Sequence, residues 1–321
     1  MSSCFNRKDL IYTVYQEKSI SKAAQKLFVS QPSLSIMIRK IEEEIGLPLF
    51  DRTSKPIRLT EAGMEYIKAA EAIMHIEKSF DNYVNATNEL LTGSLTIGGN
   101  QLLSSQVLPK YISDFIRRYP NIRLHLEDDN SLALENMITS GQLDLVIDNR
   151  KLDDEVFEQR LWRTEHLLLA VPAGFACNRG LERYQLREED ILGETYLSSD
   201  VKAVPLDGFA EIPFISMTKD NDTRRRSDEI LKEAGITPNR ILEIDRLVTL
   251  YNFIEIGTAA SVVSDTLVRS IRHHGGKVIF YRLESSHAQR DIFVSYKRNR
   301  YYSKAMKAFI ELIFTEEKVS N

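Results

Sequence analysis

The chain has 321 residues, of which 43% are hydrophobic and 27% charged, and its formal net charge is −4. This length exceeds that of one ordinary hydrophobic core and predicts two or three domains. No apolar run approaches the roughly 18 residues of a membrane span, and the N-terminal MSSCFNRKDL lacks the apolar core of a signal peptide, so we expect a cytoplasmic protein without a membrane partner.

Charge is distributed unevenly along the chain. Residues 1–60 contain ten Lys/Arg and six Asp/Glu, a balance of +4, whereas the remainder contains 32 and 40, a balance of −8. A basic N-terminal part on an acidic body is expected when only that part contacts phosphate. The two cysteines, Cys4 and Cys177, lie far apart without CxxC spacing or a histidine partner, so neither a disulfide framework nor a zinc site is expected. We expect no metal and no cofactor.

Three short helices are predicted in the basic part. We expect Asn6 to cap the first, Ser21 to cap the second (KAAQKLF), and Ser30 to cap the third, which has Pro32 in its first turn and ends at Gly46. The third helix has an apolar stripe with spacings of four, three and four, formed by Leu34, Ile38, Ile41 and Ile45. This stripe predicts its core face.

The opposite face of the third helix begins with small polar side chains. A short helix followed by such a turn predicts a helix-turn-helix whose second helix enters the major groove; a solvated amphipathic helix pair is the alternative. The predicted DNA contacts in this pair of helices are Ser21, Ser30, Gln31, Pro32, Ser33, Ser35, Ile36 and Arg39.

A basic hairpin and a long helix are expected next. The segment LPLFDRTSKPIRLT contains two short extended runs around a turn with Arg52 and Lys55, which predicts a wing that contacts the DNA backbone or the minor groove. Thr60 is expected to cap a helix that nothing breaks before Gly93. Apolar spacings of three and four predict a dimerisation seam, with packing against its own chain as the alternative. The seam residues are Tyr66, Ile73, Ile76, Phe80 and Tyr83.

The segments SISKAAQKLFVSQPSLS, IRKIEEEIGLPLFDR and LTEAG together resemble the DNA-binding domain of LysR-type transcriptional regulators. This resemblance implies a winged helix-turn-helix domain at 1–60, a linker helix at 61–92 and an effector-binding domain at 93–321. It further implies promoter DNA and a small-molecule effector as partners, RNA polymerase as a further partner, and a dimer of dimers. The position after Ser35, often arginine in the family, is Ile36, which suggests an apolar contact such as one with a thymine methyl group.

The body of the chain alternates strand and helix patterns, as in GSLTIGG, VLPKYISDFIRRYP, NIRLHLED and LDLVID, which predicts an α/β domain. The resemblance implies two lobes like those of periplasmic binding proteins. We expect one lobe at 93–161 plus 267–321 and the other at 162–266.

Ligands of such sheets lie at the ends of strands and the starts of helices. Polar residues at these places are predicted to bind the effector, although each has an alternative role as a cap or turn residue. They are Asn100 and Gln101, Asp148 and Asn149, Ser198 after ETYL, and Thr218 after PFISM.

Two other classes of function remain as alternatives. An enzyme is disfavoured because the sequence contains no GxSxG, HExxH, Walker loop or GxGxxG. The second alternative is a DNA-binding regulator with no physiological small ligand, whose distal domain serves oligomerisation or partner contact.

Overall fold

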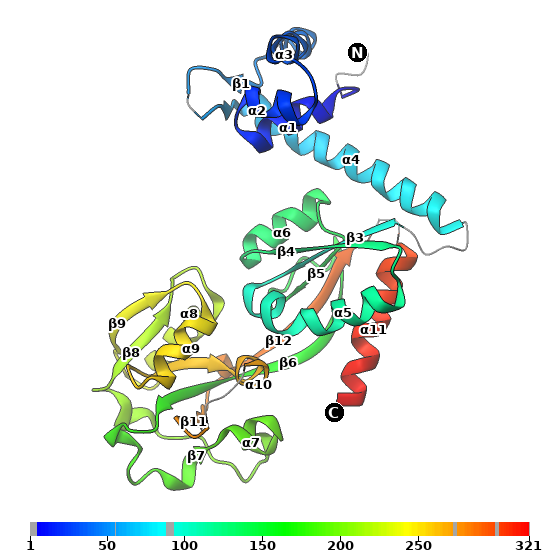
Figure 1. The fold of residues 1–321 in the computed structure, drawn as a ribbon. Coiled ribbons are helices and arrows are strands. Elements are labelled where there is room, and N and C mark those ends of the chain that lie inside the picture. The colour runs from blue at the N-terminus through cyan, green and yellow to red at the C-terminus, as the bar shows by residue number, and fades with distance from the viewer. Residues whose placement is uncertain (1–4, 55, 88–92, 272–274, 299–301, 321) are drawn as a thin grey trace. The chain divides into compact units, whose positions relative to one another are not determined.

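The computed structural model describes residues 5–54, 56–87, 93–271, 275–298 and 302–320 (Figure 1). The chain divides into two compact units, residues 1–90 with 139–142 and residues 91–138 with 143–321. The first unit is mainly helical. Its elements are α1 (Lys8–Glu17), α2 (Ile20–Lys26), α3 (Gln31–Ile45), the antiparallel hairpin of β1 (Phe50–Asp51) and β2 (Arg58–Leu59), and α4 (Glu61–Thr87).

The helix boundaries follow local chemistry. The Ser30 hydroxyl accepts a hydrogen bond from the backbone N–H of Ser33 at 3.3 Å, Pro32 lies in the first turn of α3, and Gly46 ends that helix at φ 81°. These three predictions are confirmed. The Thr60 hydroxyl likewise accepts from the N–H of Gly63 at 3.0 Å, so the predicted cap of α4 is also confirmed.

Two predicted caps are wrong. Helix α1 follows Arg7 without a side-chain cap, so Asn6 does not cap it. Helix α2 is capped by Ser19, whose hydroxyl accepts from the N–H of Lys22, whereas Ser21 lies inside the helix. The backbone of Ser19 is extended, at φ −158° and ψ 121°, as a capping residue requires.

The second unit has two lobes (Figure 1). The first lobe contains β3 (Gly93–Gly99), the π-helical turn η1 (Leu103–Val107), α5 (Leu108–Arg118), β4 (Ile122–Asp128), α6 (Ser131–Ser140), β5 (Leu145–Asp148), β12 (Gln289–Lys297) and α11 (Lys304–Ser320). Its strands run in the order β4-β3-β5-β12-β6, with β3 parallel to β4 and β5, and β12 antiparallel to its neighbours.

The second lobe is built around β8 (Pro213–Met217), which is parallel to β9 (Asn239–Ile244), and around the end of β6 (Phe157–Pro172). Its other regular elements are β7 (Gln185–Leu186), α7 (Glu188–Leu192), α8 (Asp222–Glu233), α9 (Leu247–Glu255), β10 (Ser261–Ser264), α10 (Asp265–Ser270) and β11 (Val278–Arg282). Short 3₁₀ turns complete it at Ala176–Asn178, Glu182–Tyr184, Thr195–Leu197, Leu206–Phe209 and Ser286–Ala288.

Strand β6 passes from one lobe to the other. Its residues up to His166 pair with β12, and those from Leu167 pair with β10 and β11. The chain returns to the first lobe only at β12, so the predicted return at residue 267 is too early. The reason is strand β11, which pairs with the second-lobe part of β6 and with β7 and so keeps the chain in that lobe up to Arg282.

The first lobe has a buried apolar cluster that includes Phe115 and Phe309. The second lobe has one cluster that includes Tyr251 and another that includes Phe214. Trp162 lies in the cluster of the first lobe, edge-on to Tyr111. In the described part of the chain, no helix has the length and apolar character to cross a membrane.

Candidate functional site

The N-terminal turn of α3 presents the small polar side chains that the sequence predicted to contact DNA. Gln31 and Pro32 are exposed, while Ser33 and Ser35 are half-buried. The Gln31 amide donates to the Ser35 hydroxyl at 3.1 Å, and the hydroxyls of Ser30 and Ser33 lie 2.7 Å apart. These hydrogen bonds hold the amide and hydroxyl groups in fixed positions, which is an advantage when they must match the edges of base pairs.

The rest of this face is exposed as well. Ile36 is 56% exposed, and Arg39 and Ser21 are also exposed. Phe28, in the turn before α3, is 97% exposed. Its φ of 56° is a left-handed backbone conformation that residues other than glycine rarely adopt. Phe28 is not among the predicted DNA contacts.

The hairpin β1–β2 is fastened to α3 by Glu42. One oxygen of this carboxylate accepts the backbone N–H groups of Leu49 and Phe50, at 2.8 and 3.2 Å, and the other pairs with Arg52 at 2.6 Å. Arg52 therefore braces the hairpin, and its side chain is still 38% exposed. Lys55 lies outside the described residues.

Helix α4 has two kinds of apolar residue. Tyr66 is 6% exposed and its ring stacks on Phe5 at 4.8 Å, so it belongs to the core of the first unit and not to an exposed seam as predicted. Ile73 is half-buried, whereas Ile76 and Phe80 are 70% and 64% exposed. Tyr83 lies on the same helix, and its side chain is outside the described part of the structure.

A cavity of about 410 Å³ lies between the lobes of the second unit. Four predicted effector residues line it together: Asn100, Gln101, Asn149 and Thr218. The other lining residues are Leu102, 128–131, Met217, 220–223, 245–247 and Arg290. Predicted strand ends from both lobes thus meet at one cavity, as expected for sheets of this kind.

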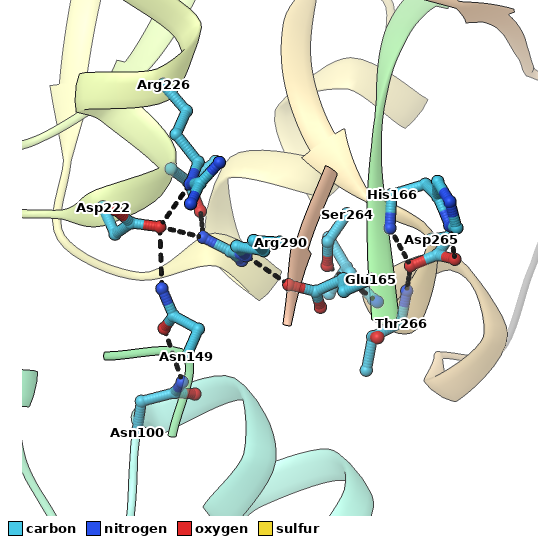
Figure 2. A network of polar contacts seen from close by, with 12 residues as sticks. Asn100, Asn149, Glu165, His166, Asp222, Arg226, Ser264, Asp265, Thr266 and Arg290 are labelled. Carbon is cyan, nitrogen blue, oxygen red and sulfur yellow. Dashed lines mark hydrogen bonds and ion pairs between the residues drawn. The ribbon is translucent and has the colours of Figure 1, made fainter. Parts of the chain in front are cut away.

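A chain of polar contacts crosses this cavity (Figure 2). The Asn100 amide donates to Asp148 at 2.8 Å and to the side-chain oxygen of Asn149 at 3.4 Å, and Asn149 in turn donates to Asp222 of α8 at 2.7 Å. Asp222 also accepts from Arg290 of β12 at 2.9 Å. Asn149 and Asp222 therefore form a direct hydrogen bond between the two lobes.

A second contact joins the lobes among the lining residues. With its amide oriented so that the oxygen faces the guanidinium, Gln101 accepts from Arg246, at 3.2 Å from Nε. The pKa of the nearby Asp128 carboxyl is raised, because burial outweighs the attraction of Arg246.

Two predicted effector residues do not line the cavity. Asp148 is 3% exposed, and one of its oxygens accepts from Asn100. Ser198 follows a 3₁₀ turn, Thr195–Leu197, and not a strand, so it does not lie at a strand end; its carbonyl accepts from Arg282. Sequence reasoning missed Asp222, Arg246 and Arg290, since these charged residues lie near a helix start or within a strand and carried no motif.

Asp222 yields a prediction about acid sensitivity. Burial raises the pKa of its carboxyl, but the charges of Arg290 and Arg226 outweigh burial and lower the pKa to about 2. A carboxyl with a depressed folded-state pKa stabilises the fold above its unfolded value, near 3.9, and loses this contribution as the pH falls through the folded value. Replacing Asp222→Asn should therefore cost about 2–3 kcal/mol at pH 7 and progressively less between about pH 4 and pH 2.

This prediction is checked by urea unfolding of both proteins from pH 7 to pH 2, followed by the fluorescence of Trp162, the single tryptophan. The exposed Asp207→Asn provides the control. Parallel pH profiles for wild type and Asp222→Asn would show that Asp222 does not supply this part of the stability.

Comparison with known families agrees with this geometry. Residues 88–317 match the family model of the LysR substrate binding domain, and residues 6–64 match that of the bacterial regulatory helix-turn-helix protein, lysR family.

Related proteins align along nearly the whole chain. The uncharacterized HTH-type transcriptional regulator YcgK of Bacillus subtilis is 28% identical over 302 residues, covering 93% of this chain and 90% of the relative. A probable RuBisCO transcriptional regulator of Cyanidioschyzon merolae is 25% identical over 308 residues, covering 94% of each.

Solved structures share the fold. A full-length OxyR variant from Pseudomonas aeruginosa has a TM-score of 0.65 at 18% identity, covering 97% of this chain and 96% of that one. Full-length CbnR in complex with its target DNA has a TM-score of 0.64 at 17% identity, covering 99% of each chain. The two family models together span most of the sequence, so the chain belongs to the LysR-type family and is a DNA-binding transcriptional regulator with an effector-binding domain.

Proposed function

We propose that this regulator binds a near-palindromic promoter site as a dimer, or as a dimer of dimers, and that a small molecule in the interlobe cavity alters its contact with DNA and RNA polymerase. The division of labour follows the predicted domains: residues 1–60 read DNA, 61–92 pair two chains, and 93–321 bind the effector. We place its action in the cytoplasm, where the promoter of a bacterial regulator lies.

The observation that supports base reading is the ordered polar turn at the start of α3. Its amide and hydroxyl groups are accessible, while the apolar stripe of the same helix, Leu34, Ile38 and Ile41, is buried in the core. One face of α3 is held in the core, and the first turn of its opposite face is polar. A helix of this kind can insert into the major groove. Arg39 on α3 is exposed and the Arg52 side chain on the wing is 38% exposed, so both can contact the phosphates that flank the bases.

The observation that supports effector binding is the cavity between the lobes. Hydrogen bonds at its lining join Asn149 to Asp222 and Gln101 to Arg246, so a bound molecule competes with or reinforces contacts between the lobes. A ligand that prefers one lobe arrangement shifts the population toward it. The alternative of a regulator without a small ligand leaves this polar cavity without a use.

Recovery of genomic fragments by the purified protein, followed by binding to the best fragment at several salt concentrations, tests the DNA-binding part. A shared sequence with dyad symmetry and a steep salt dependence is the expected result. Recovery of unrelated fragments with equal affinity would contradict sequence-specific reading.

Two substitutions should separate base reading from phosphate contact. Gln31→Ala removes a group placed to meet a base edge, and should reduce the preference for the specific site by about 1–3 kcal/mol, or roughly 5–150-fold. Arg52→Ala should weaken binding to all sequences and reduce the salt slope by about 1. Titration of specific and random DNA at three salt concentrations measures both effects.

Arg52 also pairs with Glu42, so Arg52→Ala could act only by destabilising the wing. If Arg52→Ala lowers thermal stability but leaves the salt slope unchanged, then Arg52 only braces the wing. Glu42→Gln is the matched control, because it weakens the same ion pair without removing a positive charge from the DNA-facing hairpin.

A further inference from the structure

The positive charge at the inner wall of the interlobe cavity is already paired within the chain. Arg290 lines the cavity and is 7% exposed. Its Nε donates to Glu165 at 2.5 Å, and its Nη1 donates to Asp222 at 2.9 Å and to the Thr223 hydroxyl at 3.1 Å. A ligand anion that approached Nε or Nη1 of Arg290 would have to displace one of these groups.

Asp222 occupies the position that suits such an anion. It is the first residue of α8, where free backbone N–H groups and the helix dipole favour negative charge. Its carboxylate accepts from the side chains of Arg225, Arg226, Arg290 and Asn149 (Figure 2). Arginine donors, an amide donor and a helix start are the surroundings in which proteins hold a ligand carboxylate, and here the carboxylate belongs to the chain.

The charges left for a ligand are mostly negative. With Asp222 and Arg290 paired, the charged lining residues are Asp128, Asp129, Asp220 and Asp245 against Arg246. Asp220 and Asp245 are exposed to the cavity and make no hydrogen bond or ion pair within the described residues. Arg246 already donates to Gln101.

We propose that Asp222 is a built-in counter-anion that fills the anion position of the cleft and excludes carboxylate effectors from it, so that the natural effector carries an amine or another cationic group. This inference rests on the proposed effector-binding function and specifies the chemical class of the effector. Asp222 acts as a specificity-determining residue, and the exposed carboxylates of Asp220 and Asp245 provide the attraction for the cation.

Chemical rescue tests the first half of the proposal. Asp222→Ala leaves a space of carboxylate size beside Arg290, Arg226 and Asn149, so formate should raise the thermal midpoint of this variant saturably, relative to equal chloride. Wild type and Asp222→Asn, whose side chains still fill the space, should show no such rise. A rise of equal size in wild type, or none in Asp222→Ala, would overturn the built-in anion. If Asp222→Ala does not fold, Asp222→Gly with acetate replaces the missing CH₂–COO⁻ group and is read in the same way.

Matched probes test the class of effector. Full-length protein is heated with 1,4-diaminobutane, butanedioate or 1,4-butanediol at constant ionic strength. We expect a saturable rise with the diamine alone, lost in Asp220→Asn/Asp245→Asn and retained in the control Asp207→Asn/Glu211→Gln, whose residues lie away from the cavity. A rise with butanedioate and none with the diamine would overturn the cationic class while supporting a ligand-binding cleft.

DNA binding measured with the same probes distinguishes this inference from the proposed function. A diamine that stabilises the protein and changes its affinity or footprint on the best genomic fragment supports both. A diamine that stabilises the protein through Asp220 and Asp245 but leaves DNA binding unchanged supports the cationic class and contradicts regulation by an effector. A diamine stabilisation that survives in the Asp220→Asn/Asp245→Asn variant overturns the assignment of the cation's attraction to Asp220 and Asp245.

Discussion

Replacing Arg290 with leucine is expected to lower the free energy of unfolding of the effector-binding unit by about 3–5 kcal/mol. The Arg290 and Glu165 side chains are 6% and 2% exposed, and the two residues stand directly opposite each other where β12 pairs with β6. Removing the cation leaves the Glu165 carboxylate buried without its counter-charge, which is far more costly than losing an exposed pair. Asp222 also loses one of its donors.

Urea unfolding of the full-length protein, followed by Trp162 fluorescence and circular dichroism, measures this effect. Arg117→Leu is the matched control, because Arg117 pairs with Asp114 on α5 but its side chain is 74% exposed. The control should cost less than about 1 kcal/mol. Equal small losses for the two variants would contradict the importance of the buried pair.

The double variant Glu165→Leu/Arg290→Leu shows which lost contact of Arg290 causes the loss of stability. It removes both buried charges at once, so it should recover much of the stability lost in Arg290→Leu. Recovery would mean that the penalty comes from the stranded carboxylate of Glu165. Failure to recover would instead assign the penalty to the contacts of Arg290 with Asp222 and Thr223.

The DNA-binding part could be predicted from sequence because its signals are local. Ser30, Pro32 and Gly46 lie at the two ends of the same helix, α3. The residue type alone indicates the backbone role of each. The exception is also local: Ser19 and Ser21 have the same side chain, and only backbone conformation decides which of them caps α2. Tyr66 was assigned to the seam because spacing along α4 does not reveal that Phe5 covers it.

The cleft could be predicted only in part, because its residues are far apart in the sequence. Asn100, Asn149 and Thr218 were found because each follows an apolar strand, which is a pattern within a few residues. Arg290 was missed because its role depends on the register of β12 against β6, across more than a hundred residues. Ser198 was wrongly included because ETYL has the composition of a short strand but forms a 3₁₀ turn.

Aspartate in place of Ile76 is expected to leave the chain folded and to weaken its binding to a two-half-site promoter by at least about 100-fold, because binding through two linked heads gains roughly 10²–10⁴-fold over binding through one. Ile76 and Phe80 lie one turn apart on α4 and are 70% and 64% exposed. Large exposed apolar side chains at this spacing are expected to be covered by a second copy of the helix, and a carboxylate buried there would be unpaired.

Light scattering across a range of protein concentrations measures assembly, and titration of DNA with one or two half-sites measures the consequence. Ile76→Leu is the control, since it keeps an apolar side chain of similar volume and should preserve both. A variant Ile76→Asp that assembles and binds as wild type does would contradict the α4 seam. A monomeric variant that binds a single half-site with wild-type affinity would show that the substitution removed pairing and left the base-reading surface of α3 intact. The tight promoter binding would then depend on joining two heads, each of which reads its own half-site.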